Sequence, residues 1–138
     1  MKSLLILLTA MIFAGCSSSS DTSYTVASFE NTKWVIANID GKAPSSSVTN
    51  QPYIVFTGTT GNVSGNSGCN TFSGSYTSSG NSLTFSPIAA TKMFCDGAMD
   101  FEQSFLNLLN ECDSYLVSNN ILTLYGKDGR KAMFKPAN

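Results

Sequence analysis

The residues of this chain whose type suits them best to chemistry are its four cysteines, Cys16, Cys69, Cys95 and Cys112. The chain contains no histidine, which removes the commonest general base, the commonest metal ligand and every Cys-His or Ser-His nucleophile pair. Lys92 lies three residues before Cys95 and could lower the pKa of its thiol, but no histidine is present to act as its base. No Cys-x-x-Cys motif occurs, so neither a thioredoxin-like site nor a zinc knuckle is predicted. We therefore expect structural cysteines, no metal and no cofactor.

Carboxylates are the other candidate catalytic groups, and four of them gather in one segment: Asp96, Asp100, Glu102 and Glu111. Their spacing alone does not exclude a glycosidase-type pair. Helix surfaces commonly carry such charges, however, and no alternating acidic calcium loop is present. Eight basic residues stand against nine acidic ones, which leaves no basic face for nucleic acid. The sequence thus predicts a protein that is not an enzyme and does not bind nucleic acid.

The first residues have the pattern of a bacterial export signal. Lys2 precedes an apolar run over residues 4–13, which is too short to span a bilayer but fits the core of a signal peptide. The run ends in Phe13-Ala14-Gly15-Cys16, which resembles the lipobox, where the cysteine receives palmitate and becomes the mature N-terminus. We expect a signal peptide over residues 1–15, then a lipidated Cys16 and a flexible serine-rich tether over residues 16–28. In enterobacterial lipoproteins, an aspartate directly after the lipidated cysteine keeps the protein in the inner membrane. This chain has Ser17 at that position, which favours a lipid-anchored protein of the bacterial cell envelope, in the outer membrane.

Export places the three remaining cysteines in an oxidising compartment, where pairing is expected. Cys69 and Cys95 lie in turn-like segments next to glycines, which favours a Cys69–Cys95 disulfide closing a loop of about 26 residues. Cys112 lies on the apolar stripe of a predicted helix and is expected to be a buried, unpaired thiol. The alternative pairing, Cys95–Cys112, would join the two ends of that helix across about 25 Å, so it requires the helix to be absent.

Short strands separated by turn signals are predicted for most of the remaining chain. Asp40-Gly41, Ser118-Asn119-Asn120 and Lys127-Asp128-Gly129 have the composition of tight turns between strands. The predicted strands cover residues 34–39, 53–56, a short stretch around 63, 72–78, 83–85, 115–117, 121–125 and 131–134.

One segment, from Asp96 to Cys112, has helical periodicity instead. Apolar residues recur there at steps of three and four, which gives one stripe on a helix: Ala98, Phe101, Phe105, Leu108 and Cys112. Asp96 is the predicted N-cap of this helix. The expected fold class is α+β, an antiparallel curled β-sheet or small β-barrel of about seven to eight short strands with one α-helix packed against it.

Several motifs occur in an order that points to a known family. The opening contains Trp34-Val35-Ile36 and Ile39-Asp40-Gly41, and residues 68–76 contain a Gly-Cys-Asn, Gly and Tyr pattern. Thr91-Lys92-Met93-Phe94-Cys95 then follows as a Thr-x-Met-x-Cys segment. Together they resemble the META domain family, which includes HslJ-like heat-inducible lipoproteins. The resemblance covers about Phe29 to Phe134 and implies a META/HslJ-like domain over residues 29–138.

This resemblance implies a small envelope domain connected with heat shock and drug tolerance, without an established enzymatic activity. The motif residues would then have mainly structural roles, because glycines permit turns and asparagine tolerates left-handed backbone geometry. The alternative to purely structural roles is a binding face formed by Asn70, Phe72 and Tyr76. Cys112 has no counterpart in the family pattern.

The expected function is therefore that of a non-enzymatic, membrane-anchored envelope lipoprotein that supports stress or drug tolerance by binding. Its expected partners are the membrane, through the N-terminal lipid, and an envelope protein or small ligand that the sequence does not identify. The alternative function is a lipoprotein inhibitor of a periplasmic or host hydrolase, either a protease or a lysozyme, in which Ser/Gly-rich loops form an exposed wedge.

Overall fold

The structure, a computed structural model, describes residues 27–138. The predicted signal peptide, the lipidated Cys16 and all but the last two residues of the predicted tether lie outside these residues. No helix in the described part of the chain is both long enough and apolar enough to cross a membrane.

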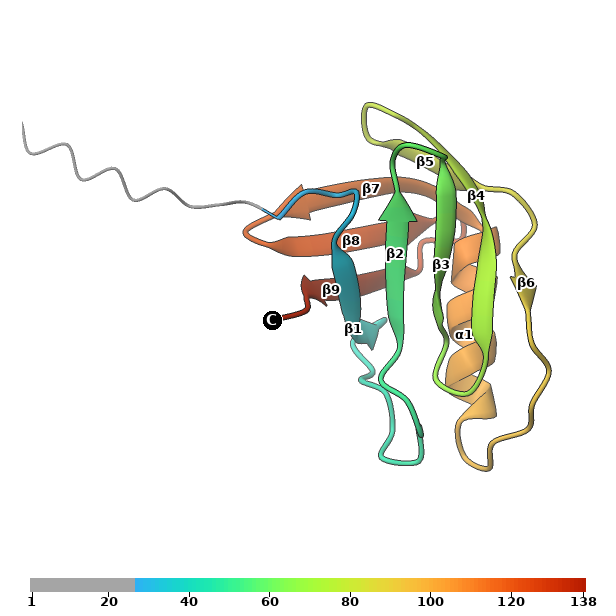
Figure 1. The fold of residues 1–138 in the computed structure, drawn as a ribbon. Helices are drawn as coiled ribbons and strands as arrows, with labels where there is room; N and C mark the ends of the chain where they lie inside the picture. The colour runs from blue at the N-terminus through green and yellow to red at the C-terminus, as the bar shows by residue number, and fades with distance from the viewer. Residues whose placement is uncertain (1–26) are drawn as a thin grey trace, which may run out of the picture.

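The described residues form a curled antiparallel sheet with one helix beside it (Figure 1). Eight strands follow one another in the order β3-β2-β1-β9-β8-β7-β5-β4, and pairing between β4 and β3 closes them into a barrel. The short β6 pairs with β4 in addition. The elements are β1 (Lys33–Ile39), β2 (Tyr53–Thr57), β3 (Asn62–Asn66), β4 (Thr71–Ser79), β5 (Ser82–Phe85), β6 (Ala89–Ala90), α1 (Met99–Asn110), β7 (Cys112–Ser118), β8 (Ile121–Gly126) and β9 (Lys131–Pro136). The predicted α+β barrel with a single helix is confirmed.

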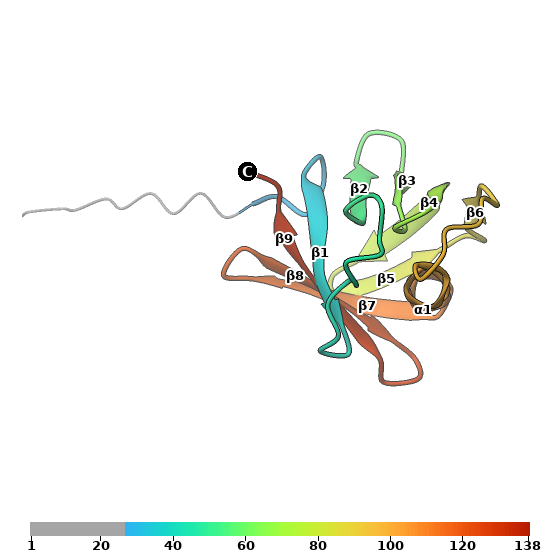
Figure 2. The ribbon, with the colours of Figure 1, turned by 90° about the horizontal axis from the view of Figure 1, so that it is seen from below.

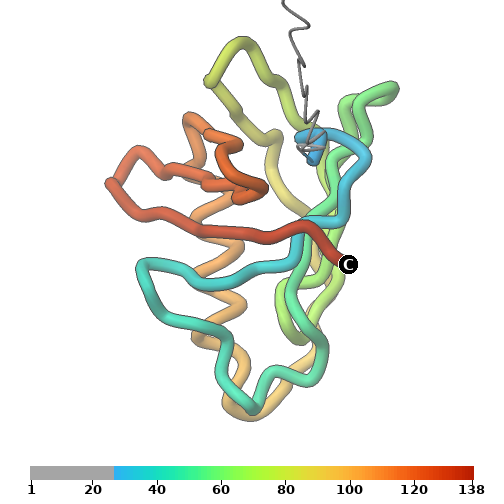
Figure 3. Tube along the Cα trace, turned by 90° about the vertical axis from the view of Figure 1, so that its left-hand side faces the viewer, coloured from blue at the N-terminus to red at the C-terminus, as the bar shows by residue number. Residues whose placement is uncertain are grey.

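The first and last strands of the domain are neighbours in the barrel. β9 lies between β1 and β8, so the last strand pairs with the first, as Figure 3 shows for the C-terminal end of the trace. The long β4 pairs with β3 through its first half and with β5 through its second half. The start of β4 therefore lies beside both β3 and β6, and the loop that connects β3 to β4 enters at this point.

The inside of the barrel is filled by apolar side chains from alternate strand positions. In β1 and β2 the inward residues include Trp34, Ile54 and Phe56, which are fully buried. The helix α1 packs against this core, and Figure 2 views it almost along its axis, beside β5 and β7. Its Phe105 side chain packs edge to face on Phe72, with ring centroids 5.6 Å apart. The helix therefore serves as the predicted cover of the apolar sheet face.

Both ends of the helix differ from the prediction. The helix begins at Met99, after Ala98 as N-cap, and no side chain bonds to its first turn. Asp96 does not cap it, because Gly97, with φ of 73°, turns the chain between Asp96 and the helix. At the other end, Cys112 is the first residue of β7 rather than the last of the helical stripe. It is buried all the same, because a strand follows the helix directly and points this side chain into the core.

Candidate functional site

A disulfide joins Cys69, in the loop between β3 and β4, to Cys95, in the segment before α1, with the two Cα atoms 5.8 Å apart. The predicted Cys69–Cys95 pairing is confirmed, and the Cys95–Cys112 alternative is wrong. Cys112 is unpaired and buried, and this burial raises the pKa of its thiol to about 11. A thiol with this pKa is almost wholly protonated at neutral pH, so Cys112 lacks the thiolate that a nucleophilic cysteine requires.

Beneath this disulfide lies a buried carboxylate. Glu102 projects from α1 into the β3–β4 loop, and its residue is only 5% exposed. Its Oε2 accepts hydrogen bonds from the Ser67 hydroxyl at 2.7 Å, the Cys69 amide at 3.2 Å and the Asn70 amide at 2.8 Å. Its Oε1 accepts a bond from the Asn70 side-chain amide at 2.5 Å.

These bonds decide the charge of Glu102. Burial by itself raises the pKa of the carboxyl, but the hydrogen bonds from Asn70, Ser67 and Cys69 outweigh it and lower the pKa below its ordinary value. The carboxylate is therefore ionised at neutral pH, and hydrogen bonds from uncharged loop donors stabilise its charge. Both of its oxygens accept hydrogen bonds from the β3–β4 loop, so Glu102 connects that loop to the helix.

Asn70 connects this carboxylate to the segment before the helix. Its side-chain Oδ1 accepts bonds from the Met93 amide at 2.7 Å and from the Thr91 hydroxyl at 2.8 Å. Its Nδ2 donates to the Met93 carbonyl at 3.0 Å as well as to Glu102. The side-chain amide of Asn70 thus pairs with both backbone polar groups of Met93, in the manner of a neighbouring strand.

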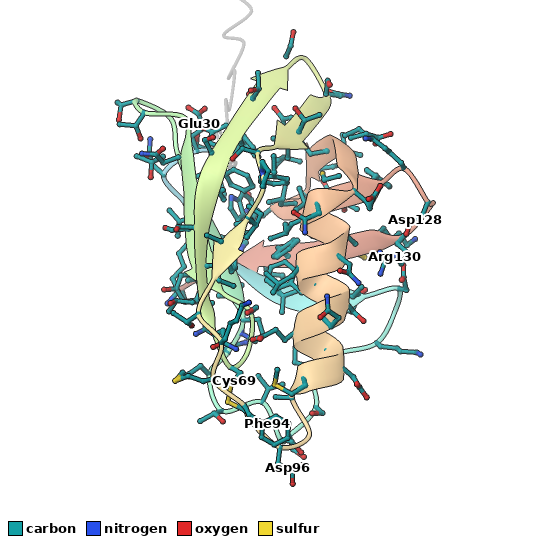
Figure 4. All side chains as sticks on the ribbon, turned by 90° about the vertical axis from the view of Figure 1, so that its right-hand side faces the viewer. Glu30, Cys69, Phe94, Asp96, Asp128 and Arg130 are labelled. Atoms are coloured by element: carbon teal, nitrogen blue, oxygen red, sulfur yellow. A yellow bond between two sulfur atoms is a disulfide. The ribbon has the colours of Figure 1, made fainter. Side chains whose placement is uncertain are left out.

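Residues 91–96, which we call the clamped loop, lie between β6 and the helix on this support. They have no helical or strand structure as far as Cys95. Met93 is 58% exposed and Phe94 is 79% exposed. In Figure 4 Phe94 lies at one end of the molecule, next to Cys69 and Asp96. Phe94 therefore lies between a residue bonded to Asn70 and a residue bonded covalently to Cys69.

Exposed apolar side chains are concentrated on this loop. Among the described residues, four large apolar side chains are exposed: Met93, Phe94, Leu116 and Tyr125. Two of the four are neighbours on the clamped loop, and Phe94 is the most exposed of the set. An apolar side chain presented on fixed backbone is typical of an anchor residue in a protein interface.

The predicted binding face of Asn70, Phe72 and Tyr76 requires correction, because all three side chains are buried. Phe72 packs on the helix, and the Tyr76 hydroxyl donates a 2.6 Å hydrogen bond to Glu30. Burial, together with that carboxylate, raises the pKa of Tyr76 above its ordinary value. These residues support the neighbouring surface, and the large apolar side chains that the motif segments expose are those of the clamped loop.

Phe94 escaped the sequence prediction of site residues although it lies in the second motif. The available signal was local: a large apolar residue directly before a cysteine, in a segment without strand or helix periodicity. Such a residue has no regular element that would direct its side chain into the core.

A separate open groove of about 750 Å³ lies on the outer side of β1. Two lysines, Lys33 and Lys135, border it together with Val35, Val48 and other residues, and no carboxylate side chain does. The Lys33 ammonium lies 4.2 Å from the centre of the Tyr53 ring. Neither Glu102 nor the clamped loop borders this groove, so it is distinct from the site described above.

Comparisons with known proteins agree on the fold. The family model of the META domain matches residues 27–138. A protein from Burkholderia xenovorans, solved by NMR, is 25% identical with a TM-score of 0.64 over 80% of this chain and 84% of that one. A second NMR structure is 26% identical with a TM-score of 0.61, covering 76% and 89%. A crystal structure of a duf4847 family protein from Bacteroides vulgatus, 16% identical with a TM-score of 0.53 over 78% and 93%, shares the fold. No curated protein matches the chain significantly.

Proposed function

Because the chain belongs to the META domain family, we propose that it is a non-enzymatic binding protein of the bacterial cell envelope. It is held to a membrane, the outer membrane, by lipid on Cys16, as in HslJ-like lipoproteins, and it supports stress or drug tolerance through a protein partner. The clamped loop is its binding surface.

The observation that carries this proposal is the exposure of Phe94 on a fixed backbone. Met93 and Phe94 are exposed, while the residues that fix them are buried and have their polar atoms occupied. The side chains that most resemble catalytic groups, Glu102 and Asn70, therefore act as internal supports. An arrangement that uses its buried polar groups to present an apolar side chain is suited to binding.

The anchoring part of the proposal rests on the sequence before the described residues. Phe13-Ala14-Gly15-Cys16 follows an apolar run that fits a signal peptide. Growth with labelled palmitate tests it directly. The label is expected on the wild-type protein and not on the Cys16→Ala variant, and an unlabelled wild-type protein would remove the anchor.

Site-specific crosslinking in intact cells tests the binding part. A photoreactive amino acid is placed at position 94 and, in a matched control, at position 116, because Leu116 is an exposed apolar residue (45%) on β7, outside the clamped loop. A covalent adduct of defined mass is expected from position 94 and not from position 116. No adduct from position 94, or the same adduct from both positions, would contradict the assignment of the clamped loop as the binding surface.

The second candidate function is inhibition of a hydrolase. One observation favours it: backbone attachments immediately precede and follow Phe94. A partner that bound only the Phe94 side chain would not require the backbone of the clamped loop to be held on both sides of Phe94.

A further inference from the structure

Phe94 is the single residue between two attachments to the body of the domain. On its N-terminal side, the backbone amide and carbonyl of Met93 are both bonded to the side chain of Asn70. On its C-terminal side, Cys95 is joined to Cys69, the residue before Asn70. The first attachment leads to Asn70 and the second to Cys69, which are neighbours in the β3–β4 loop.

That loop is itself fixed. The backbone amides of Cys69 and Asn70 both donate to the buried carboxylate of Glu102, and the Asn70 side chain donates to it too. Phe94 is thus held on a support that is bonded in turn to the helix. Since the backbone around Phe94 is ordered before binding, little conformational entropy remains to be lost when a partner binds.

Two properties define the partner that fits this surface. It must have a pocket for a large apolar side chain, because Phe94 is 79% exposed on a backbone that is held on both sides. It must also contact the backbone on either side of that pocket, because the structure holds the backbone at Met93 and Cys95. A peptidase cleft combines both: it binds a peptide along its backbone and sets specificity with one deep pocket.

From this geometry we propose that the clamped loop inhibits a serine peptidase whose primary specificity pocket accepts large apolar side chains, with Phe94 in that pocket. The proposal rests on the assignment of the clamped loop as the binding surface and names its class of partner. Met93 then precedes the anchor in the cleft, and the Phe94–Cys95 peptide bond lies at the peptidase's serine.

The attachments also explain how the loop would resist cleavage. A serine peptidase transfers the acyl group of Phe94 to its own serine oxygen and releases the amine of Cys95, and water then hydrolyses the resulting ester. Here the released amine stays in place, because Cys95 remains bonded to Cys69 and Met93 remains bonded to Asn70. The amine can attack the ester carbonyl, re-form the peptide bond and return the proton to the serine oxygen. Cleavage and resynthesis then compete, and the peptidase stays occupied.

Two other partners fit the loop less well. A lysozyme cleft binds polar sugars between two carboxylates, and that mode of binding does not use a peptide backbone held on both sides of one apolar side chain. A lipid surface would accept Phe94, but it makes no use of a backbone fixed on both sides, and the charges of Lys92 and Asp96 flank the apolar pair with opposite signs.

The first experiment measures inhibition of chymotrypsin, a serine peptidase with an apolar primary pocket, by the purified full-length protein with its disulfide intact. Inhibition of cleavage of a small chromogenic substrate is expected, with the Phe94–Cys95 bond of the inhibitor largely intact afterwards by mass spectrometry. Phe94→Ala is expected to weaken inhibition by about 30-fold or more, the loss typical of a central anchor side chain. Leu116→Ala is the matched control and is expected to leave inhibition unchanged.

The second experiment changes the specificity instead of removing it. Trypsin has an acidic primary pocket, so Phe94→Lys is expected to inhibit trypsin and to lose inhibition of chymotrypsin, whereas the wild-type protein does the reverse. Phe94 is too exposed for either substitution to disturb the core, and equal urea unfolding midpoints for wild type and variants verify this.

Four outcomes would overturn the proposal: no inhibition of chymotrypsin by the wild-type protein, rapid and complete cleavage after Phe94, undiminished inhibition by Phe94→Ala, or no inhibition of trypsin by Phe94→Lys. Phe94-dependent binding to anionic phospholipid vesicles without peptidase inhibition would overturn it in favour of a lipid surface. If inhibition fails while position 94 still gives its own crosslinked adduct in cells, the peptidase is wrong and the binding surface stands.

Discussion

Replacing Glu102 by glutamine tests how much the buried carboxylate contributes to the domain. Glutamine has nearly the same shape, but only one of its two terminal atoms accepts hydrogen bonds. If its oxygen takes the place of Oε2, the bonds from Ser67, Cys69 and Asn70 backbone remain, and its NH₂ group faces the Nδ2 of Asn70, also a donor. The opposite orientation would place the NH₂ group against three donors, which is worse.

The size of the effect follows from these contacts. Leaving the Asn70 side-chain donor without its acceptor costs about 1–3 kcal/mol, and each remaining bond loses the roughly 1 kcal/mol by which a charged acceptor exceeds a neutral one. Relief from burying a charge offsets part of this loss. We expect Glu102→Gln to lower the free energy of unfolding by about 2–4 kcal/mol.

The pH dependence provides an independent check. The pKa of Glu102 is lower in the folded than in the unfolded protein, so the unfolded state binds a proton first as the pH falls. The stability from its ionisation is therefore complete above the unfolded pKa of about 4.3 and is lost as the pH falls through the lower folded pKa. Glu102→Gln is expected to remove this part of the acid dependence.

Urea unfolding of the disulfide-intact protein measures both effects. A loss of about 3 kcal/mol would move the midpoint by about 2 M at a slope near 1.5 kcal/mol/M. Glu111→Gln is the matched control, because Glu111 directly follows the same helix and is exposed. A Glu102→Gln midpoint within about 0.3 M of wild type at pH 7, with an unchanged acid dependence, would refute the assignment of the buried carboxylate as the support of this loop.

Three further predictions concern Tyr76 and the three cysteines of the described residues. Tyr76→Phe removes the hydroxyl that donates to Glu30 at 2.6 Å, and it is expected to lower the free energy of unfolding by about 1–2 kcal/mol in urea titrations. Because burial raises its pKa to about 11, the Cys112 thiol is expected to react with Ellman's reagent at pH 8 only when urea unfolds the protein; fast labelling of the folded protein would contradict this. Replacing both Cys69 and Cys95 by serine opens a crosslink with a sequence separation of 26 residues and is expected to cost about 3.5 kcal/mol, measured as a lower urea midpoint than that of the oxidised wild type.

Local signals in the sequence predicted the barrel well. Asp40-Gly41 and Asn119-Asn120 adopt positive φ values at the turns where the sequence placed them, since these residue types tolerate that geometry. Helix ends were predicted less well. The apolar repeat extended the predicted helix to Cys112 because such a pattern reflects which residues are buried, not the element they belong to. Cys112 is buried, but as the first residue of a strand.

Of the candidate site, only the disulfide was predicted, because it depends on a single residue type. Cysteines of an exported protein are expected to pair, and the glycines next to Cys69 and Cys95 indicated the pair that the structure confirms. Asn70 was assigned to a possible binding face because it lies in the same motif as Phe72 and Tyr76. Its partner Glu102 is 32 positions away, and only the folded chain brings the two together. A local signal pointed to the exposure of Phe94, but the fixed backbone on which it is presented depends on that long-range support.

The clamped loop and the start of the described chain lie at opposite ends of the domain. In Figure 4 Glu30 is near the end where the described residues begin, and Phe94 is at the other end. Ala27, the first described residue, is bonded through its amide to Asn120 in the β7–β8 turn, so that end has a fixed place. Attachment at the start of the described domain would consequently leave Phe94 on the side away from the attachment point, where a partner in a binding screen can reach it.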